Sequence, residues 1–198
     1  MALNWDSIKK GFLSSPNGIE ILEKTYKDHY ESTLDTIVNS ASIITVNGVL
    51  RLLCSGETKY ENMLLFNNTF RSYIGENRYA VAHDVFGGLY ALTENGISYF
   101  SPDALVWEDL MISYEGFIEW ISTKSISDFY QSFMWSGFED YVKSIKPGEG
   151  IHLYPFLWAK ECDVHTASKR IVRFDELLAV NNDFRMDFER LAKYEQGE

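Results

Sequence analysis

Short runs of β-branched and other apolar residues fill the chain between residues 33 and 110 and are separated by turn-forming residues. The runs "TLDTIV", "SIITV" and "VLRLLC" come first, and residues 79–83, 89–93 and 97–100 form a second group. Such runs are typical of β-strands, because branched side chains fit the pleated surface of a sheet. This part of the chain therefore predicts a sheet, whose last strand includes Val106 and Trp107.

Asn-Gly pairs mark places where this sheet is expected to turn. The pair is typical of a two-residue hairpin loop, since both residues accept positive φ angles. One pair is Asn47-Gly48, and the other is Asn95-Gly96, where we expect a type I′ turn. Tight hairpins join antiparallel strands, so the predicted sheet is mostly antiparallel.

Helical spacing of apolar residues dominates the regions before and after the sheet. Trp5, Ile8 and Phe12 share one helical face, and we expect a second short helix over residues 19–26. Three apolar stripes follow residue 113: Phe117, Trp120 and Ile121; Ile126, Phe129, Tyr130 and Phe133; and Phe138, Tyr141, Val142 and Ile145. Ser125 and Asp128 match a capping box at the start of the second stripe.

The C-terminal part combines an irregular aromatic connection, "IHLYPFLW", with a predicted strand, "KRIVRF". We expect Asp175 to cap a last helix, whose buried side includes Leu177, Phe184, Phe188 and Leu191. No internal repeat or linker is visible, so one α+β domain is expected. Its parts are N-terminal helices (1–30), a sheet-rich core (31–110), helices (111–146), and a connection, strand and C-terminal helix (147–198).

The net charge of −11 is concentrated in one window. Between Arg78 and Lys124 there are seven acidic residues and no Lys or Arg. Such a field repels nucleic acid and attracts a basic partner. An acidic surface also keeps a chain rich in aromatic residues soluble, so the charge alone does not establish a partner.

Neither a signal peptide nor a membrane span is visible in the sequence, so we expect no contact with a membrane. The two cysteines, Cys54 and Cys162, lie far apart in sequence. Two thiols without an export signal are typical of a reducing compartment, and we expect a cytoplasmic protein.

Candidate catalytic and metal-binding motifs are weak. Gly87-Gly88 lacks the further residues of a phosphate or dinucleotide loop, and a bend between two strands explains the pair better. His83-Asp84 and the Cys162 to His165 segment each lack the other ligands of a metal site. Cys54 lies in an apolar run, which predicts an inert buried thiol. We therefore expect no cofactor, no metal and no catalytic residue.

Aromatic residues next to acids are more informative. Trp and Tyr are frequent anchors of protein interfaces, and an acidic rim suits a cationic partner. The segment "SPDALVWEDL" holds both kinds of residue within ten positions. The candidate partner-binding residues are Asp84, Tyr99, Asp103, Trp107, Glu108 and Asp109.

Several blocks resemble, in their order, the bacterial family called domain of unknown function 2625. They are "LRLLCSG", "VAHDVFGGLYAL", "ISYFSPDALVWEDL", "YEGFIEWI", "FYQSFMWSGFEDYV", "YPFLWAKE" and "SKRIVRFDEL". The family is similar to an outlying member of the SUKH superfamily, whose strand, Asp, Gly and strand pattern is matched by Ala82, Asp84, Gly87, Gly88 and Leu89. Cys54 replaces a glycine of the family's pattern, which argues against a ligand cradle there.

The resemblance implies an α+β sheet flanked by helices and a binding role, since many SUKH domains are immunity proteins against nuclease toxins. The leading hypothesis is a non-enzymatic domain that neutralises a basic partner such as a nuclease toxin. Two alternatives stay open. One is a small-molecule-binding protein or enzyme with an aromatic pocket, and the other is a scaffold that forms homo-oligomers through "YPFLW".

Overall fold

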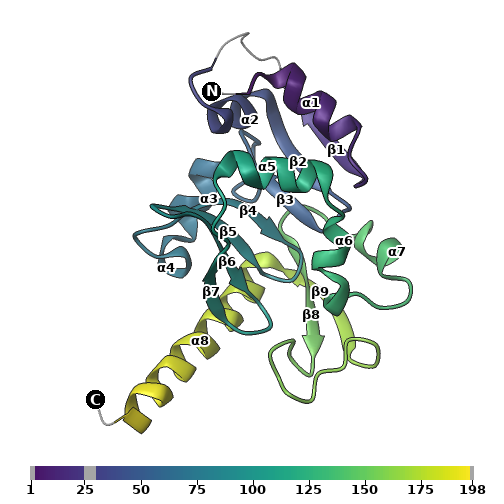
Figure 1. The fold of residues 1–198 in the computed structure, drawn as a ribbon. Coiled ribbons are helices and arrows are strands. Elements are labelled where there is room, and N and C mark those ends of the chain that lie inside the picture. Colours follow the sequence, from purple (N-terminus) through teal and green to yellow (C-terminus); the bar gives the residue numbers. More distant parts are fainter. Residues whose placement is uncertain (1–2, 25–29, 197–198) are drawn as a thin grey trace.

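The computed structural model describes residues 3–24 and 30–196, with a seven-stranded antiparallel sheet at the centre (Figure 1). Each strand pairs with its neighbours in sequence. The strands are β1 (Ile19–Glu23), β2 (Ala41–Val46), β3 (Leu50–Leu53), β4 (Tyr79–Asp84), β5 (Leu89–Thr93), β6 (Gly96–Ser101) and β7 (Val106–Asp109). A separate antiparallel pair is formed by β8 (Glu149–Tyr154) and β9 (Ser168–Arg173). The predicted α+β class and the antiparallel sheet are confirmed.

Helices flank the sheet. They are α1 (Trp5–Leu13), α2 (Thr33–Ser40), α3 (Met63–Thr69), α4 (Arg71–Ile74), α5 (Tyr114–Thr123), α6 (Ile126–Phe129), the 3-10 helix η1 (Gln131–Phe133), α7 (Phe138–Val142) and α8 (Phe174–Gln196). In the described ranges, none of these helices combines the length and apolar character that crossing a membrane requires.

Strand register separates the two faces of the sheet. Asp84, Tyr90 and Tyr99 share one face through β4, β5 and β6, and the ring of Phe117 in α5 lies 5.1 Å from that of Tyr90. The opposite face carries His83, whose ring contacts side chains of α3 and α8. Adjacent residues of one strand therefore pack into two different layers, as the alternation of a strand requires.

The two Asn-Gly pairs form different turns. Asn47 and Gly48 have φ angles of 51° and 70°, and the turn closes with a 3.0 Å hydrogen bond from Val49 N to Val46 O, as the hairpin prediction requires. At Asn95-Gly96, Gly96 is already the first residue of β6, where it pairs with Thr93 of β5. Gly96 has a positive φ angle, but Asn95 does not. The type I′ prediction is wrong there, because the loop residues are 94 and 95.

Three predicted elements are wrong. Residues 19–23 form the edge strand β1, since Ile21 pairs with Ile44 of β2; the rest of the predicted helix, 25–26, lies outside the described residues. The run "TLDTIV" begins helix α2, capped by Ser32, whose hydroxyl accepts the N–H of Asp35 at 3.0 Å. The connection "IHLYPFLW" begins as strand β8. Sheet pairing and capping override local composition at these sites.

The second half of α8 extends away from the body of the molecule (Figure 1). Leu177 is buried as predicted, but Phe188 and Leu191 are 44% and 59% exposed, so they do not belong to a buried side. Phe184 packs on Trp158, with ring centroids 4.4 Å apart. The aromatic segment after β8 therefore contacts this chain's own helix. At the start of α6, Ser125 makes no side-chain capping bond, so the predicted capping box is absent there.

Candidate functional site

The turn between β4 and β5 closes around the buried carboxylate of Asp84. Oδ1 accepts the backbone N–H groups of Phe86 and Gly88 at 2.9 and 2.8 Å. Oδ2 accepts the hydroxyl groups of Tyr99 and Tyr130 at 2.9 and 3.0 Å. Four donors therefore satisfy one carboxylate, which joins this turn to β6 and to the end of α6.

The two glycines of this turn are required by its geometry. Gly87 has a φ of 91°, which side chains other than glycine rarely adopt. A Cβ on Gly88 would lie 2.1 Å from Oδ2 of Asp84 and 2.7 Å from the Tyr99 hydroxyl. The interpretation of the pair as a bend between strands is confirmed.

Burial controls the ionisation of this network. It raises the pKa of Asp84, against four hydrogen bonds that lower it, and it raises the pKa values of Tyr90, Tyr99 and Tyr130 well above their ordinary range. The three phenols therefore keep their protons at neutral pH and remain hydrogen-bond donors. Tyr90 and Tyr130 extend the network through a 2.8 Å bond between their hydroxyls.

Two candidate partner-binding residues lie inside the protein. Asp84 is 0% exposed and Tyr99 is 3% exposed, so neither presents a contact surface to a partner in this structure. Strand alternation and the turn direct both side chains under α5 and α6, where they hold the fold together. The expectation that Asp84 and Tyr99 face a partner is corrected accordingly.

The other four candidates lie on or beside the edge strand β7. Asp103, Glu108 and Asp109 are exposed, and Trp107 is partly buried beneath the guanidinium of Arg78, 4.5 Å from its ring centroid. The hydroxyls of two β6 serines donate to Asp103 and Asp109. In the described part of the chain, Glu108 has no side-chain hydrogen bond of this kind, and it points to the opposite face of β7 from Trp107.

Most acids of the charged window are on the surface. The exposed ones are Glu94, Asp103, Glu108, Asp109, Glu115 and Glu119. Within the described ranges none of the six forms an ion pair with Lys or Arg. Their charge is therefore available to attract a cationic molecule.

An exposed aromatic residue beside these acids was missed in the sequence. Phe129 of α6 is 38% exposed, and its ring lies 5.4 Å from those of both Trp120 and Tyr99. Exposed Glu119 and Asp128 directly precede Trp120 and Phe129, and Glu108 pairs across the sheet with Tyr99. We call the surface formed by Glu108, Glu119, Trp120, Asp128 and Phe129 the Phe129 face. The helical spacing placed Phe129 in one apolar stripe with Ile126, Tyr130 and Phe133, but α6 is only four residues long.

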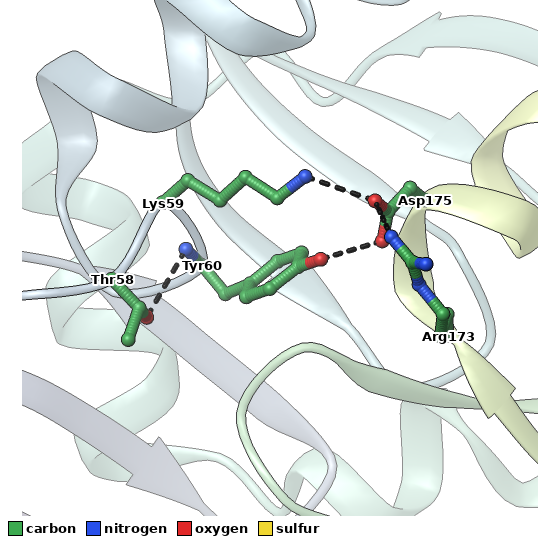
Figure 2. Close-up of polar contacts among 5 residues, drawn as sticks. All are labelled: Thr58, Lys59, Tyr60, Arg173 and Asp175. Atoms are coloured by element: carbon green, nitrogen blue, oxygen red, sulfur yellow. Dashed lines mark hydrogen bonds and ion pairs between the residues drawn. The ribbon is translucent and has the colours of Figure 1, made fainter.

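A second polar cluster joins the segment after β3 to the start of α8 (Figure 2). Asp175 accepts hydrogen bonds from Tyr60 Oη at 2.5 Å, from Lys59 Nζ at 2.9 Å and from Arg173 Nη2 at 2.8 Å. Partial burial raises the pKa of Asp175, but these three donors outweigh it and hold the pKa well below its ordinary value. The cluster is an ion pair network with every partner supplied by this chain.

Side chains that bind metals do not gather in the described ranges. There, no three His, Cys, Asp or Glu residues lie close enough to hold a metal ion. Cys54 is buried, and burial strongly raises the pKa of its thiol, as expected of an inert cysteine. His83 is buried too, and burial followed by the charge of Arg51 lowers its pKa to about 3.

Two hollows lie at opposite ends of the sheet. A hollow of about 520 Å³ separates β7 from α8 and is lined by Trp107 and Phe188. A larger groove of about 870 Å³ lies over β1, β2 and β3 and is bordered by α7. Both are within the size range of small-molecule sites.

The sheet, its flanking helices and the closed β4–β5 turn define a mixed α+β protein built on an antiparallel sheet. Comparison with known families assigns the chain to one family within this class. The model of the family described as protein of unknown function DUF2625 matches residues 5–177, and the chain belongs to this family.

Two relatives are similar over shorter stretches. The chain is 24% identical over 159 residues to the uncharacterized protein YbfG of Escherichia coli (strain K12), covering 77% of this chain and 73% of YbfG. It is 30% identical over 120 residues to an uncharacterized protein of Haemophilus influenzae, covering 55% of this chain and 53% of that protein.

Proposed function

We propose that this protein is a non-enzymatic binding protein that docks a basic protein on the Phe129 face and the adjoining β7 edge. The observation that carries the proposal is the exposed Phe129 ring, which packs on Trp120 and Tyr99. Exposed acids neighbour these three residues in sequence or across the sheet, and none of these acids forms an ion pair in the described ranges. Interface energy is concentrated in a few aromatic anchors surrounded by polar residues. The Phe129 face has this composition.

Acids and aromatic rings have separate roles in this proposal. Glu108, Asp109 and Asp103 accelerate the encounter with a positively charged partner, an effect that salt screens. Phe129 and Trp120 supply the apolar area that slows dissociation, because their rings already pack on each other and lose little freedom.

The biological role that fits best is that of a cytoplasmic immunity protein, and the family is proposed as an outlying SUKH-like member. Asp84, Gly87 and Gly88 of the superfamily pattern form one closed turn here, which is the structural role such a pattern requires. Nucleases carry basic surfaces because they bind phosphates. An acidic protein that covers such a surface blocks access to nucleic acid.

The proposal is tested by a pull-down from a lysate of the native host, washed at low and then moderate salt. The test variant combines Asp103→Asn, Glu108→Gln and Asp109→Asn. The control combines Glu57→Gln, Glu76→Gln and Glu161→Gln, which removes the same charge from exposed acids outside the window. A basic protein retained by the wild type and the control, and lost from the test variant, supports the proposal.

Kinetics on the recovered protein complete the test. We expect the test variant to slow association at least about tenfold at low salt and to flatten its salt dependence. Phe129→Ala is expected to increase the dissociation rate and leave the salt dependence of association unchanged. An association rate that is the same in the test variant and the control at every salt concentration would overturn the proposal.

A further inference from the structure

The groove over β1, β2 and β3 has a polar row across its floor. Glu20 of β1 pairs with Thr45 of β2, and Thr45 pairs with Arg51 of β3. Paired residues point to the same face of a sheet, and all three line the groove. The row therefore runs from a carboxylate at the exposed edge through a hydroxyl to a guanidinium at the inner end.

Arg51 is a buried charge without an anionic partner. It is 2% exposed, and its Nη1 and Nη2 donate to the backbone carbonyls of Glu149 and Ile145, both at 3.0 Å. No carboxylate in the described ranges forms an ion pair with it. Burial lowers the pKa of the guanidinium to about 10, the direction expected when a charge is poorly compensated.

Three acids act on the charge of Arg51. Asp84 is held in its own network on the other face of the sheet, and Glu149 and Glu61 are held by their own turns. Oε2 of Glu149 accepts the backbone N–H of Lys146 at 2.9 Å. Oε2 of Glu61 accepts the hydroxyl of Thr58 at 2.7 Å and its N–H at 3.2 Å. These bonds keep both carboxylates outside ion-pair distance, although their field still favours the charged form of Arg51.

We propose that this groove binds a small monocarboxylate with an apolar body, and that the carboxylate pairs with the guanidinium of Arg51. A guanidinium has five N–H donors in a planar fork that matches a carboxylate, and two carbonyls leave three donors free. An anion here would offset the cost of the buried charge. The site is distinct from the Phe129 face and does not rest on the proposed docking function.

The other residues that line the groove indicate what the part of the ligand beyond its carboxylate is like. Ile43, Met134, Phe138 and Val142 give the groove apolar walls that suit a hydrocarbon chain or ring. Glu20, Glu61 and Glu139 also line it, so the site has too little positive charge for a phosphate dianion. Lys143 at the rim is 72% exposed and already paired with Asp140, which leaves Arg51 as the buried cation of the described lining.

The test is an NMR titration that follows backbone amide shifts with hexanoate, hexanamide and inorganic phosphate as probes. Thr45→Glu places a carboxylate directly opposite Arg51, where it competes with an anionic ligand and leaves Arg51 in place. Thr45→Gln has the same length without the charge and is the matched variant. Unfolding of both variants is measured first, to establish that the sheet forms.

We expect hexanoate to shift amides around the groove in the wild type at concentrations of about 10 mM or lower. Thr45→Glu should weaken hexanoate binding at least about tenfold more than Thr45→Gln, and hexanamide should bind at least about tenfold more weakly than hexanoate. Equal losses in the two variants, no shifts with hexanoate, or phosphate binding as tight as hexanoate would each overturn the assignment.

Discussion

The Tyr60 hydroxyl donates a 2.5 Å hydrogen bond to Oδ1 of Asp175 and so joins the segment after β3 to the first turn of α8 (Figure 2). The backbone carbonyl of the same tyrosine accepts the Nε2–H of buried His83 at 3.1 Å. One residue therefore connects a surface ion-pair cluster to a titratable group inside the protein. Asp175 and His83, at the two ends of this connection, are expected to change the stability of the fold in different pH ranges.

Asp175→Asn is expected to lower the free energy of unfolding by about 1–2 kcal/mol at neutral pH, since hydrogen bonds to a charged group are lost. The folded-state pKa of Asp175 is depressed, so its contribution is complete above the unfolded-state value of about 4. The contribution is lost as the pH falls through the range below that value, because the unfolded chain takes up the proton first. Urea unfolding at several pH values measures the difference.

Asp183→Asn is the control for this prediction, because Asp183 is exposed on the same helix. We expect it to change the stability little at any pH. If Asp175→Asn and wild type differ by the same amount at neutral pH and at about pH 3, ionisation of Asp175 does not stabilise the fold.

His83 predicts a second loss of stability, at higher pH. Its folded-state pKa of about 3 lies below the unfolded value of about 6.5, so the unfolded chain gains a proton first as the pH falls. Stability should therefore fall by about 1.4 kcal/mol per pH unit in this window. His83→Gln keeps an N–H donor for the Tyr60 carbonyl and does not titrate.

We expect His83→Gln to be less stable than wild type at neutral pH, because the ring packs against Phe66 and Phe174. From about pH 7 to pH 5 it should lose about 2 kcal/mol less stability than wild type. The control is His165→Gln, at an exposed position, and both series are followed by tryptophan fluorescence in urea. Parallel pH profiles for His83→Gln and wild type would contradict the prediction.

The extent to which each strand is buried explains which parts of the fold could be predicted. The runs that became β2 to β6 are rich in apolar and aromatic residues and are mostly buried on both faces, so composition alone identified them. β1 is an edge strand with little burial, and its identity depends on pairing with β2. α2 contains β-branched residues but buries Thr33, Thr36, Ile37 and Ser40, the spacing of one helical face.

The residues of the candidate site likewise divide into those that the sequence could predict and those that it could not. Asp103, Glu108 and Asp109 are exposed, as their charge and the adjacent turn indicated. Asp84 belongs to the same acidic window, but its burial depends on hydroxyls that come from β6 and from the segment after α6. Contacts between residues so far apart in sequence leave no local pattern, so the buried network could not be predicted from periodicity.

Gly88→Ala is expected to be among the most damaging small substitutions in the protein. The added Cβ would lie 2.1 Å from Oδ2 of Asp84, so the methyl group must displace the carboxylate and break its hydrogen bonds to Tyr99 and Tyr130. Loss of a buried, charge-assisted network costs about 3–5 kcal/mol. Gly116→Ala in α5 is the matched control, since its nearest neighbour would lie at 3.5 Å and alanine favours a helix. Urea unfolding should show a large loss for the first variant and none for the second; equal stabilities would mean that the turn relaxes without breaking the Asp84 network.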